Sequence, residues 1–237
     1  MKSSRFLCAS LVSTVIFLSP KCPLKAQSGG SNQQRLNQVL DQMDRAAANF
    51  HSLQADFVWD QYEKVVNETD TQTGTIYFRR AGHNVEMAAD ITEPDRKYVL
   101  FTDGKVQLYQ PKIDQITEYN TGKNRAEFES FLVLGFGGGG HDMLNSFDVT
   151  YAGEEKIGNT NTEILDLIPK SPKVRNTFAQ IRLWIDPSLG MSIQQRFTEP
   201  GGDDYRLAKY SNIHEGKIPD DKFKIKTTGR TKIVSQG

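Results

Sequence analysis

Three short strands joined by two tight turns occupy residues 94–120, and this meander limits the folds that the chain can adopt. Residues 97–102 are strand-like, and Asp103-Gly104 favours a type I′ hairpin turn, in which both central residues have positive φ. Pro111 fixes one backbone angle of the second turn before the third strand returns. Because so short a meander cannot bury itself, it has to belong to a larger antiparallel sheet.

The first 26 residues have the pattern of a cleavable signal peptide. Lys2 and Arg5 form a charged start, and residues 6–18 form an apolar run that falls short of the roughly 20 residues of a membrane span. We expect cleavage after Ala26, with an uncleaved N-terminal anchor as the alternative. The prediction is a soluble protein exported to the periplasm, with a single domain over residues 27–237.

Removal of this segment changes the charge and the cysteine content. The full sequence has 29 basic and 29 acidic residues, and the mature chain keeps 25 of the basic ones. Since no block of like charge stands out, we expect neither nucleic-acid binding nor a strongly basic membrane-binding surface. Cys8 and Cys22 both precede the cleavage site, so the mature chain has no disulfide and no thiolate site.

An amphipathic helix is predicted over residues 33–50. Apolar residues recur there at helical spacing, and Gln, Asn, Asp and Arg occupy the opposite face. Such a helix can pack on a core or lie on a membrane. The mixed charge of its polar face favours core packing.

From residue 51 onward the sequence predicts strands separated by turns. Strands that recur without intervening helices indicate an antiparallel sheet or an open barrel, and no linker divides the domain. Together with the three strands of the meander, the predicted strands number about eleven. The others are 53–60, 74–80, 85–91, 147–156, 162–168, 178–186, 191–198 and 205–213.

Residues 125–143 interrupt this series. Their apolar residues suit a short helix, which a run of glycines over 135–140 would end in a segment that cannot be rigid. Two interpretations remain open at this point: a core helix that closes one end of the barrel, and a lid over an apolar cavity. A plain packed core is likewise an alternative to the cavity.

No catalytic, metal or cofactor motif is recognised in the sequence. The glycine run lacks the Gly-Lys-Ser or Gly-Lys-Thr of a phosphate-binding loop, and the Gly-x-Ser-x-Gly motif of serine hydrolases is missing. The four histidines are scattered, without the spacing of a zinc helix. We therefore expect a binding protein that is not an enzyme and needs no cofactor or metal.

Several residues occur in an order that resembles a known family pattern, and a signal peptide and an amphipathic helix precede them. They are Pro94-Asp95, Asp103-Gly104-Lys105, Tyr109, Pro111, Gln115, the Gly-containing strand Gly74 to Arg80, and Phe223 after Pro219. In this order they make the chain resemble the LolA-like family of periplasmic carriers and sorting proteins for outer-membrane lipoproteins.

This resemblance implies a mainly β fold with some helix: an open, half-rolled antiparallel barrel with an N-terminal helix and a helical lid over an apolar cavity. It implies a monomeric carrier that binds the acyl chains of lipoproteins and shuttles them from the inner to the outer membrane. The implied partners are acylated lipoproteins, an inner-membrane release complex and an outer-membrane receptor. A lipid- or glycolipid-binding protein and an envelope-stress sensor module of the same fold are the alternatives.

The resemblance also implies site residues. In the family an arginine at the end of the second strand holds the lid through backbone hydrogen bonds, and Arg80 matches it, although Ala81 replaces the following family proline. The cavity residues are assigned on the assumption that Ile76, Phe78 and Arg80 share the inner face. The expected cavity and lid residues are Phe57, Trp59, Ile76, Phe78, Val85, Met87, Leu100, Leu108, Phe128, Phe131, Leu132 and Phe136.

Overall fold

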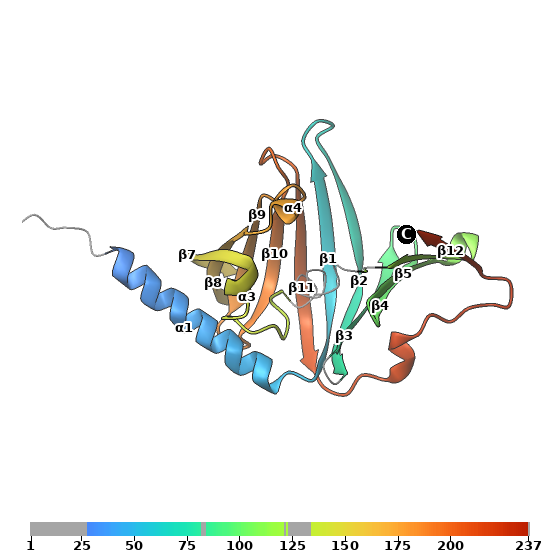
Figure 1. Cartoon of the computed structure of the whole chain (residues 1–237), viewed down its shortest axis with the longest axis horizontal. Coiled ribbons are helices and arrows are strands. Elements are labelled where there is room, and N and C mark those ends of the chain that lie inside the picture. Colours follow the sequence, from blue (N-terminus) through green and yellow to red (C-terminus); the bar gives the residue numbers. More distant parts are fainter. Residues whose placement is uncertain (1–27, 82–83, 121, 123–133, 237) are drawn as a thin grey trace, which may run out of the picture.

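The computed structural model describes residues 28–81, 84–120, 122 and 134–236, which form one open sheet of twelve strands behind an N-terminal helix (Figure 1). The predicted fold class is therefore confirmed. Residues 1–26, the expected signal peptide, lie outside the described part. No helix within the described residues is long and apolar enough to span a membrane.

Two meanders make up eleven of the twelve strands of the sheet. The first contains β1 (Ser52–Glu63), β2 (Glu68–Ala81), β3 (Asn84–Glu93), β4 (Lys97–Thr102), β5 (Lys105–Gln110) and β6 (Gln115–Asn120), with the 3-10 turn η1 (Pro111–Ile113) before β6. The second contains β7 (Phe147–Ile157), β8 (Thr160–Pro169), β9 (Gln180–Asp186), β10 (Met191–Thr198) and β11 (Tyr205–Glu215), and α3 (Met143–Ser146) precedes it. The short helices α4 (Pro172–Arg175) and η3 (Asp220–Phe223) follow β8 and β11.

The two meanders meet where β1 pairs with β11, so the strand order is β12-β6-β5-β4-β3-β2-β1-β11-β10-β9-β8-β7. In this order β6 and β7 are at nearly opposite ends of the sheet, although β7 is the next strand after β6 along the chain. The described part of the connection between them, residues 134–142, lies over one face of the sheet, where it contacts β10 and β2. We call that face the inner face.

A twelfth strand extends the sheet beyond the eleven that the sequence predicts. It is β12 (Lys232–Gln236), and it pairs in parallel with β6, whereas the other strand pairs are antiparallel. Its pattern is half-polar and exposed, so the sequence carries no alternating signal for it. The predicted turn at Asp103 and Gly104 is confirmed, since their φ angles are 52° and 72°.

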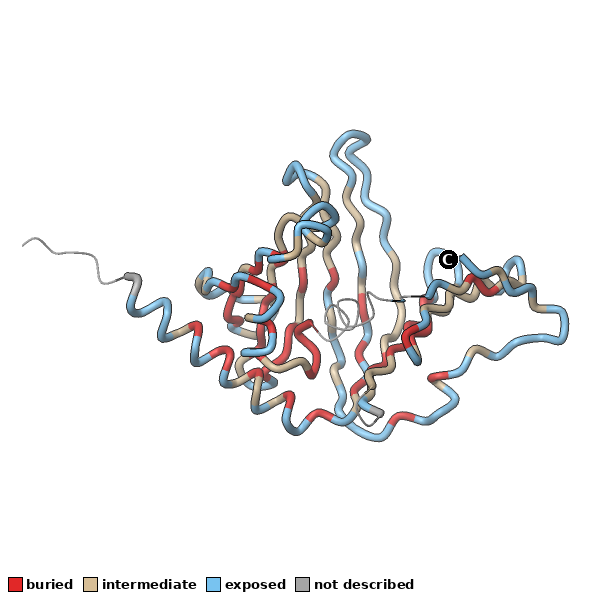
Figure 2. Tube along the Cα trace, viewed as in Figure 1, coloured by how far each residue is buried: buried red, intermediate tan, exposed pale blue. Residues whose placement is uncertain are grey.

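Helix α1 (Ser28–Asn49) covers the inner face over the second meander, as Figure 1 shows at the side of β7 and β8. Its apolar stripe is buried at Leu36, Val39, Leu40 and Met43, and it packs on side chains of β7, β8 and β9. In Figure 2 the buried (red) positions recur at intervals along this helix. The prediction that this helix packs on the core is thus confirmed.

A separate apolar cluster lies on the outer face of the first meander. It joins Tyr77, Ala88 and Leu100 of the sheet to Ile218 and Phe223 of the segment after β11. The C-terminal segment is therefore held on the outer face before the chain reaches β12.

Candidate functional site

An apolar pocket of about 350 Å³ lies on the inner face. Alternate residues of β1, β2, β3, β4, β10 and β11 form most of its wall, and Phe136 of the connection between β6 and β7 adds a further ring. The volume is at the lower end of the range of about 300–1,000 Å³ that is usual for small-molecule pockets. This pocket is the candidate functional site.

Strand register explains why the apolar side chains meet here. Phe78 of β2 pairs with Met87 of β3, and Phe57 of β1 pairs with Tyr210 of β11. Residues that face each other in an antiparallel sheet point to the same side, as do residues two apart along a strand. Ile76 therefore shares the inner face with Phe78, and all five side chains line the pocket.

Phe136 is the most buried ring of the pocket, with 1% of its surface exposed. It stacks on Phe78 at a centroid distance of 5.3 Å and meets the ring of Tyr210 edge-on at 4.5 Å. Both geometries are favourable for aromatic pairs. Burial raises the pKa of Tyr210, so its hydroxyl stays protonated over a wide pH range.

The segment that carries Phe136, residues 134–140, is here called the glycine-rich strap. On one side it is bound to β10. The backbone N–H of Ser192 donates to the carbonyl oxygen of Gly135 at 2.8 Å, and the side-chain amide of Gln195 donates to that of Leu134 at 2.7 Å. These bonds satisfy buried carbonyl groups that would otherwise be costly in an apolar site.

On its other side the strap is bound to β2. Arg80 Nη2 donates to the carbonyl oxygen of Gly137 at 2.8 Å. The guanidinium carbon of Arg80 also lies 6.0 Å from the ring centroid of Phe50, which follows α1. The arginine that the family resemblance indicated thus contacts the backbone of the connection, two positions along β2 from the pocket residue Phe78.

Close packing explains the glycines of the strap. A Cβ atom on Gly137 would lie 2.4 Å from the ring of Phe50, and one on Gly140 would lie 2.4 Å from the carbonyl oxygen of Leu40. Gly137 also has a φ of 70°, which L side chains rarely adopt. The run that the sequence analysis interpreted as non-rigid is packed against α1 at Gly140 and against Phe50, just after the helix, at Gly137.

A cluster of ionisable side chains connects the end of the strap to α1. His141 Nδ1 and Asp44 Oδ2 are 2.5 Å apart, and Asp41 lies beside them. Burial would raise the pKa of Asp44, but hydrogen bonds from the ring and backbone of His141 hold it below its usual value. One oxygen or nitrogen of each of the three residues lies within 4.8 Å of the others, so they could hold a metal ion. Asp44 and His141 already bind each other, which explains the cluster without one.

The structure distributes the expected cavity residues over three places. Val85 and Leu108 lie on the inner face, opposite Arg80 and Val99 in the register, but outside the pocket lining. Leu100 lies in the cluster on the outer face, because its neighbours Val99 and Phe101 take the inner positions. Phe128, Phe131 and Leu132 lie outside the described residues. The expected residues that line the pocket are Phe57, Trp59, Ile76, Phe78, Met87 and Phe136.

The sequence analysis missed the contribution of β10 and β11 to the pocket. Gln195 and Phe197 of β10, and Arg206, Ala208 and Tyr210 of β11, complete its wall. Alternation within these strands was detectable, but the pairing of β11 with β1 joins residues about 150 positions apart. No local signal in the sequence indicates that contact.

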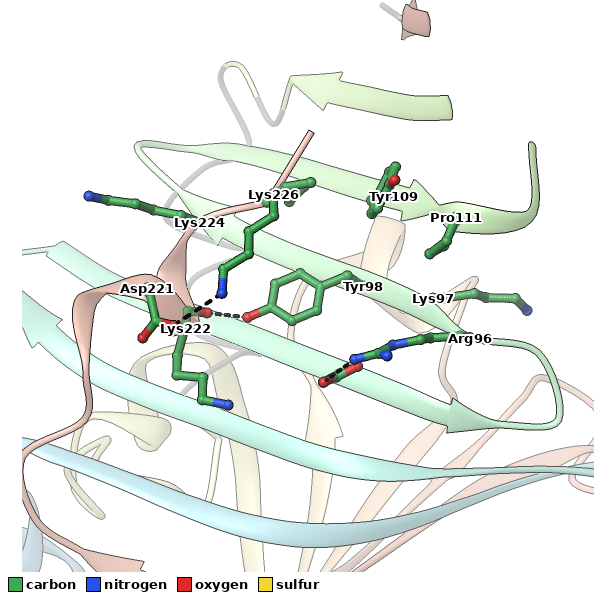
Figure 3. Close-up of a pocket in the computed structure, with 11 residues that line it drawn as sticks. Arg96, Lys97, Tyr98, Tyr109, Pro111, Asp221, Lys222, Lys224 and Lys226 are labelled. Atoms are coloured by element: carbon green, nitrogen blue, oxygen red, sulfur yellow. Dashed lines mark hydrogen bonds and ion pairs between the residues drawn. The ribbon is translucent and has the colours of Figure 1, made fainter. Parts of the chain in front are cut away.

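A second pocket, of about 340 Å³, lies on the outer face beneath the C-terminal segment (Figure 3). The Tyr98 ring is at its centre and its hydroxyl donates to the carbonyl oxygen of Lys222, while Arg96 pairs with Asp90 at 3.2 Å. Burial, with a smaller effect from the charge of Asp90, raises the pKa of Tyr98 to about 12. The bond from Tyr98 to Lys222 joins the C-terminal segment to the sheet, so we assign this pocket a structural role.

An open sheet that carries a helix, a strap and an apolar pocket on its inner face defines a half-barrel with an apolar cavity. Residues 48–226 match the family model "Outer membrane lipoprotein carrier protein LolA", so the chain belongs to the LolA family. It is similar to an outer-membrane lipoprotein carrier protein of Methylococcus capsulatus (strain Bath), with 24% identity over 172 residues, which are 73% of this chain and 74% of the relative.

Solved structures show the same fold at low sequence identity. An uncharacterised conserved protein of Thermus thermophilus is 12% identical with a TM-score of 0.56, over 86% of this chain and all of that one. MucB is 15% identical with a TM-score of 0.53, over 85% of this chain and 66% of that one. The complex of Pseudomonas aeruginosa MucA and MucB also matches, with 15% identity and a TM-score of 0.50, over 81% of this chain and 61% of that one.

Proposed function

We propose that the protein is a periplasmic carrier that binds the acyl chains of lipoproteins in the inner-face pocket and shuttles them from the inner to the outer membrane. The single observation that carries this proposal is the apolar pocket itself. Phe136 borders it, and the strap that holds Phe136 is hydrogen-bonded to β2 and to β10. Membership of the LolA family supports the ligand class.

The energetics of acyl transfer suit a carrier with partners at both ends of its route. Each buried methylene is worth about 0.8 kcal/mol, so a chain of about 15 methylenes gains on the order of 12 kcal/mol on burial. A carrier whose affinity for the chain only equals that of the bilayer cannot extract the chain unaided. A carrier with a much higher affinity cannot release it to the next membrane. The proposed partners are therefore an energised inner-membrane release complex and an outer-membrane receptor.

Native mass spectrometry of the protein purified from its own periplasm tests the proposal. We expect a co-purified triacylated lipoprotein in the wild type, and its loss when Ala208→Phe fills the pocket while the circular dichroism spectrum is retained. Free lipid in place of lipoprotein would point to a lipid-binding protein. A bound protein partner with an empty pocket would point to a sensor module, a possibility that the MucA–MucB complex suggests for this fold.

A further inference from the structure

Arg206 is the one charged residue that lines the otherwise largely apolar pocket, among the residues that the structure describes. It lies on the inner face of β11, opposite Phe197 of β10 and Gln61 of β1. Its side chain is 34% exposed, whereas Tyr210, four positions further along β11, contacts the buried Phe136. Arg206 therefore lies at the more accessible end of the pocket.

The guanidinium of Arg206 has an unused donor. Its Nη2 donates to Glu199 Oε1 at 3.2 Å, and its carbon lies 5.4 Å from the ring centroid of Phe178, another pocket residue. Its Nε is buried and has no hydrogen-bond partner within the described residues. Buried polar atoms in proteins are nearly always paired, so an unpaired cationic donor at a pocket needs an explanation.

We propose that Arg206 is a head-group subsite, at which its guanidinium binds the anionic oxygen of a carboxylate or phosphate at the end of an acyl chain. The chain then extends along β11 toward Tyr210 and Phe136. Four residues of a strand span about 13 Å, which gives the length of this path. The inference rests on the proposed acyl pocket and differs from the proposed lipoprotein in the head group, because the acyl chains of a lipoprotein end in neutral esters and amides.

The volume sets the number of chains. An apolar cavity of about 150 Å³ accommodates benzene, with its six carbons, so the pocket of about 350 Å³ accommodates about fourteen carbons. That is one acyl chain of medium length. A pocket of this volume therefore suits one chain with its oxygen-rich head at Arg206.

Arg196 provides an internal comparison. Its Nε is also buried without a hydrogen-bond partner among the described residues, and its guanidinium carbon lies 4.1 Å from the Tyr205 ring centroid. Arg196 is one position from Phe197 on β10, so it points to the outer face and does not line the pocket. The two arginines share their chemistry and differ in access to the pocket, which makes Arg196→Gln a matched control for Arg206→Gln.

Displacement of an uncharged apolar dye, 1-N-phenylnaphthylamine, tests the proposal with three probes at pH 8: myristate, tetradecyl phosphate and methyl myristate. We expect the wild type to bind the two anions roughly tenfold more tightly than the ester, as a charge-assisted hydrogen bond allows. Arg206→Gln should bind all three as the wild type binds the ester, and Arg196→Gln should behave as the wild type. Preference for one anion over the other identifies the head group.

A second variant keeps the test independent of the folding of Arg206→Gln. Glu199→Gln retains the arginine and removes the carboxylate that competes for it, so we expect myristate to bind several-fold more tightly. Equal binding of anions and ester by the wild type, or unchanged discrimination in Arg206→Gln, would overturn the head-group subsite and leave the acyl pocket standing. Failure of the dye and of all three probes to bind the wild type would instead contradict the proposed acyl pocket itself.

Discussion

Arg80 and Gly137 are 57 positions apart in the sequence and are joined by a hydrogen bond of 2.8 Å between the guanidinium and the carbonyl oxygen. The bond connects β2 of the first meander to the glycine-rich strap. Because Arg80 is exposed, the bond is accessible to a ligand or a partner that competes for it. It is therefore the contact through which we expect the strap to respond to binding.

Arg80→Leu should loosen the strap while the fold is retained. The loss of one hydrogen bond from an exposed charged group costs at most about 1.5–3 kcal/mol, so a cooperative thermal transition should persist. Hydrogen exchange of the strap amides should become faster. In Arg79→Leu, the matched control, the lost partners are Glu86 and Asp220 on the outer face, and strap exchange should be unchanged. A collapse of the melting temperature in Arg80→Leu would show that Arg80 is structural.

Phe136→Ala should destabilise the protein and enlarge the pocket. Truncation of a buried phenylalanine typically costs about 3–5 kcal/mol, and here it removes the contacts with Phe78 and Tyr210. Urea unfolding measures the cost, and dye displacement by saturated fatty acids of increasing length measures the pocket. The optimum should shift to longer chains. The optimal chain length of Phe136→Leu should lie between those of the wild type and Phe136→Ala. An unchanged optimum would mean that Phe136 does not limit the length of the ligand.

Gly137→Ala should cost more stability than Gly158→Ala, a matched glycine in the turn between β7 and β8. Both have positive φ, 70° and 60°, so both substitutions carry the left-handed penalty of about 1–2 kcal/mol. A methyl group on Gly137 would also lie 2.4 Å from the ring of Phe50, whereas nothing lies within 4 Å of a Cβ on Gly158. Urea denaturation of the two variants gives the comparison. Equal losses would indicate that the strap moves aside freely.

Tyr98 should make stability fall at alkaline pH. Its pKa is raised to about 12, mainly by burial, above the value of about 10 that tyrosine has in an unfolded chain. The folded state therefore holds this proton more tightly, so the stabilisation is complete below pH 10 and is lost as the pH rises to about 12. Urea unfolding between pH 9 and 12 measures the slope, which should be smaller in Tyr98→Phe. An identical slope in the variant would assign the effect to other tyrosines.

The first meander was predictable because its contacts are local. Each strand from β1 to β6 pairs with the next one along the chain, and turn residues such as Asp103 and Gly104 determine where the hairpins reverse. The stripe of α1 was predictable for the same reason, since its periodicity lies within one segment. Sequence patterns of this kind determine the elements and their neighbours along the chain.

The pocket was only partly predictable because it depends on strand phase and on distant pairing. Residues 98–101 are all apolar, so alternation could not show that Val99 points inward and Leu100 outward. The pairing that brings Tyr210 opposite Phe57 depends on how the two meanders meet. Ile76 and Phe78 were placed correctly on one face because alternation within β2 is unambiguous once one residue is assigned.

The strap also has a mechanical consequence for the sheet. It is bonded to β10 through Gln195 and to β2 through Arg80, and between these strands lie β11 and β1, the junction of the two meanders. Three strand spacings amount to about 14 Å, so the strap acts as a chord across the junction. We expect a ligand that breaks either bond to let the two meanders change their angle about the β1–β11 pair. In that case the size of the pocket and the shape of the sheet would change together, because the same segment of backbone contacts both.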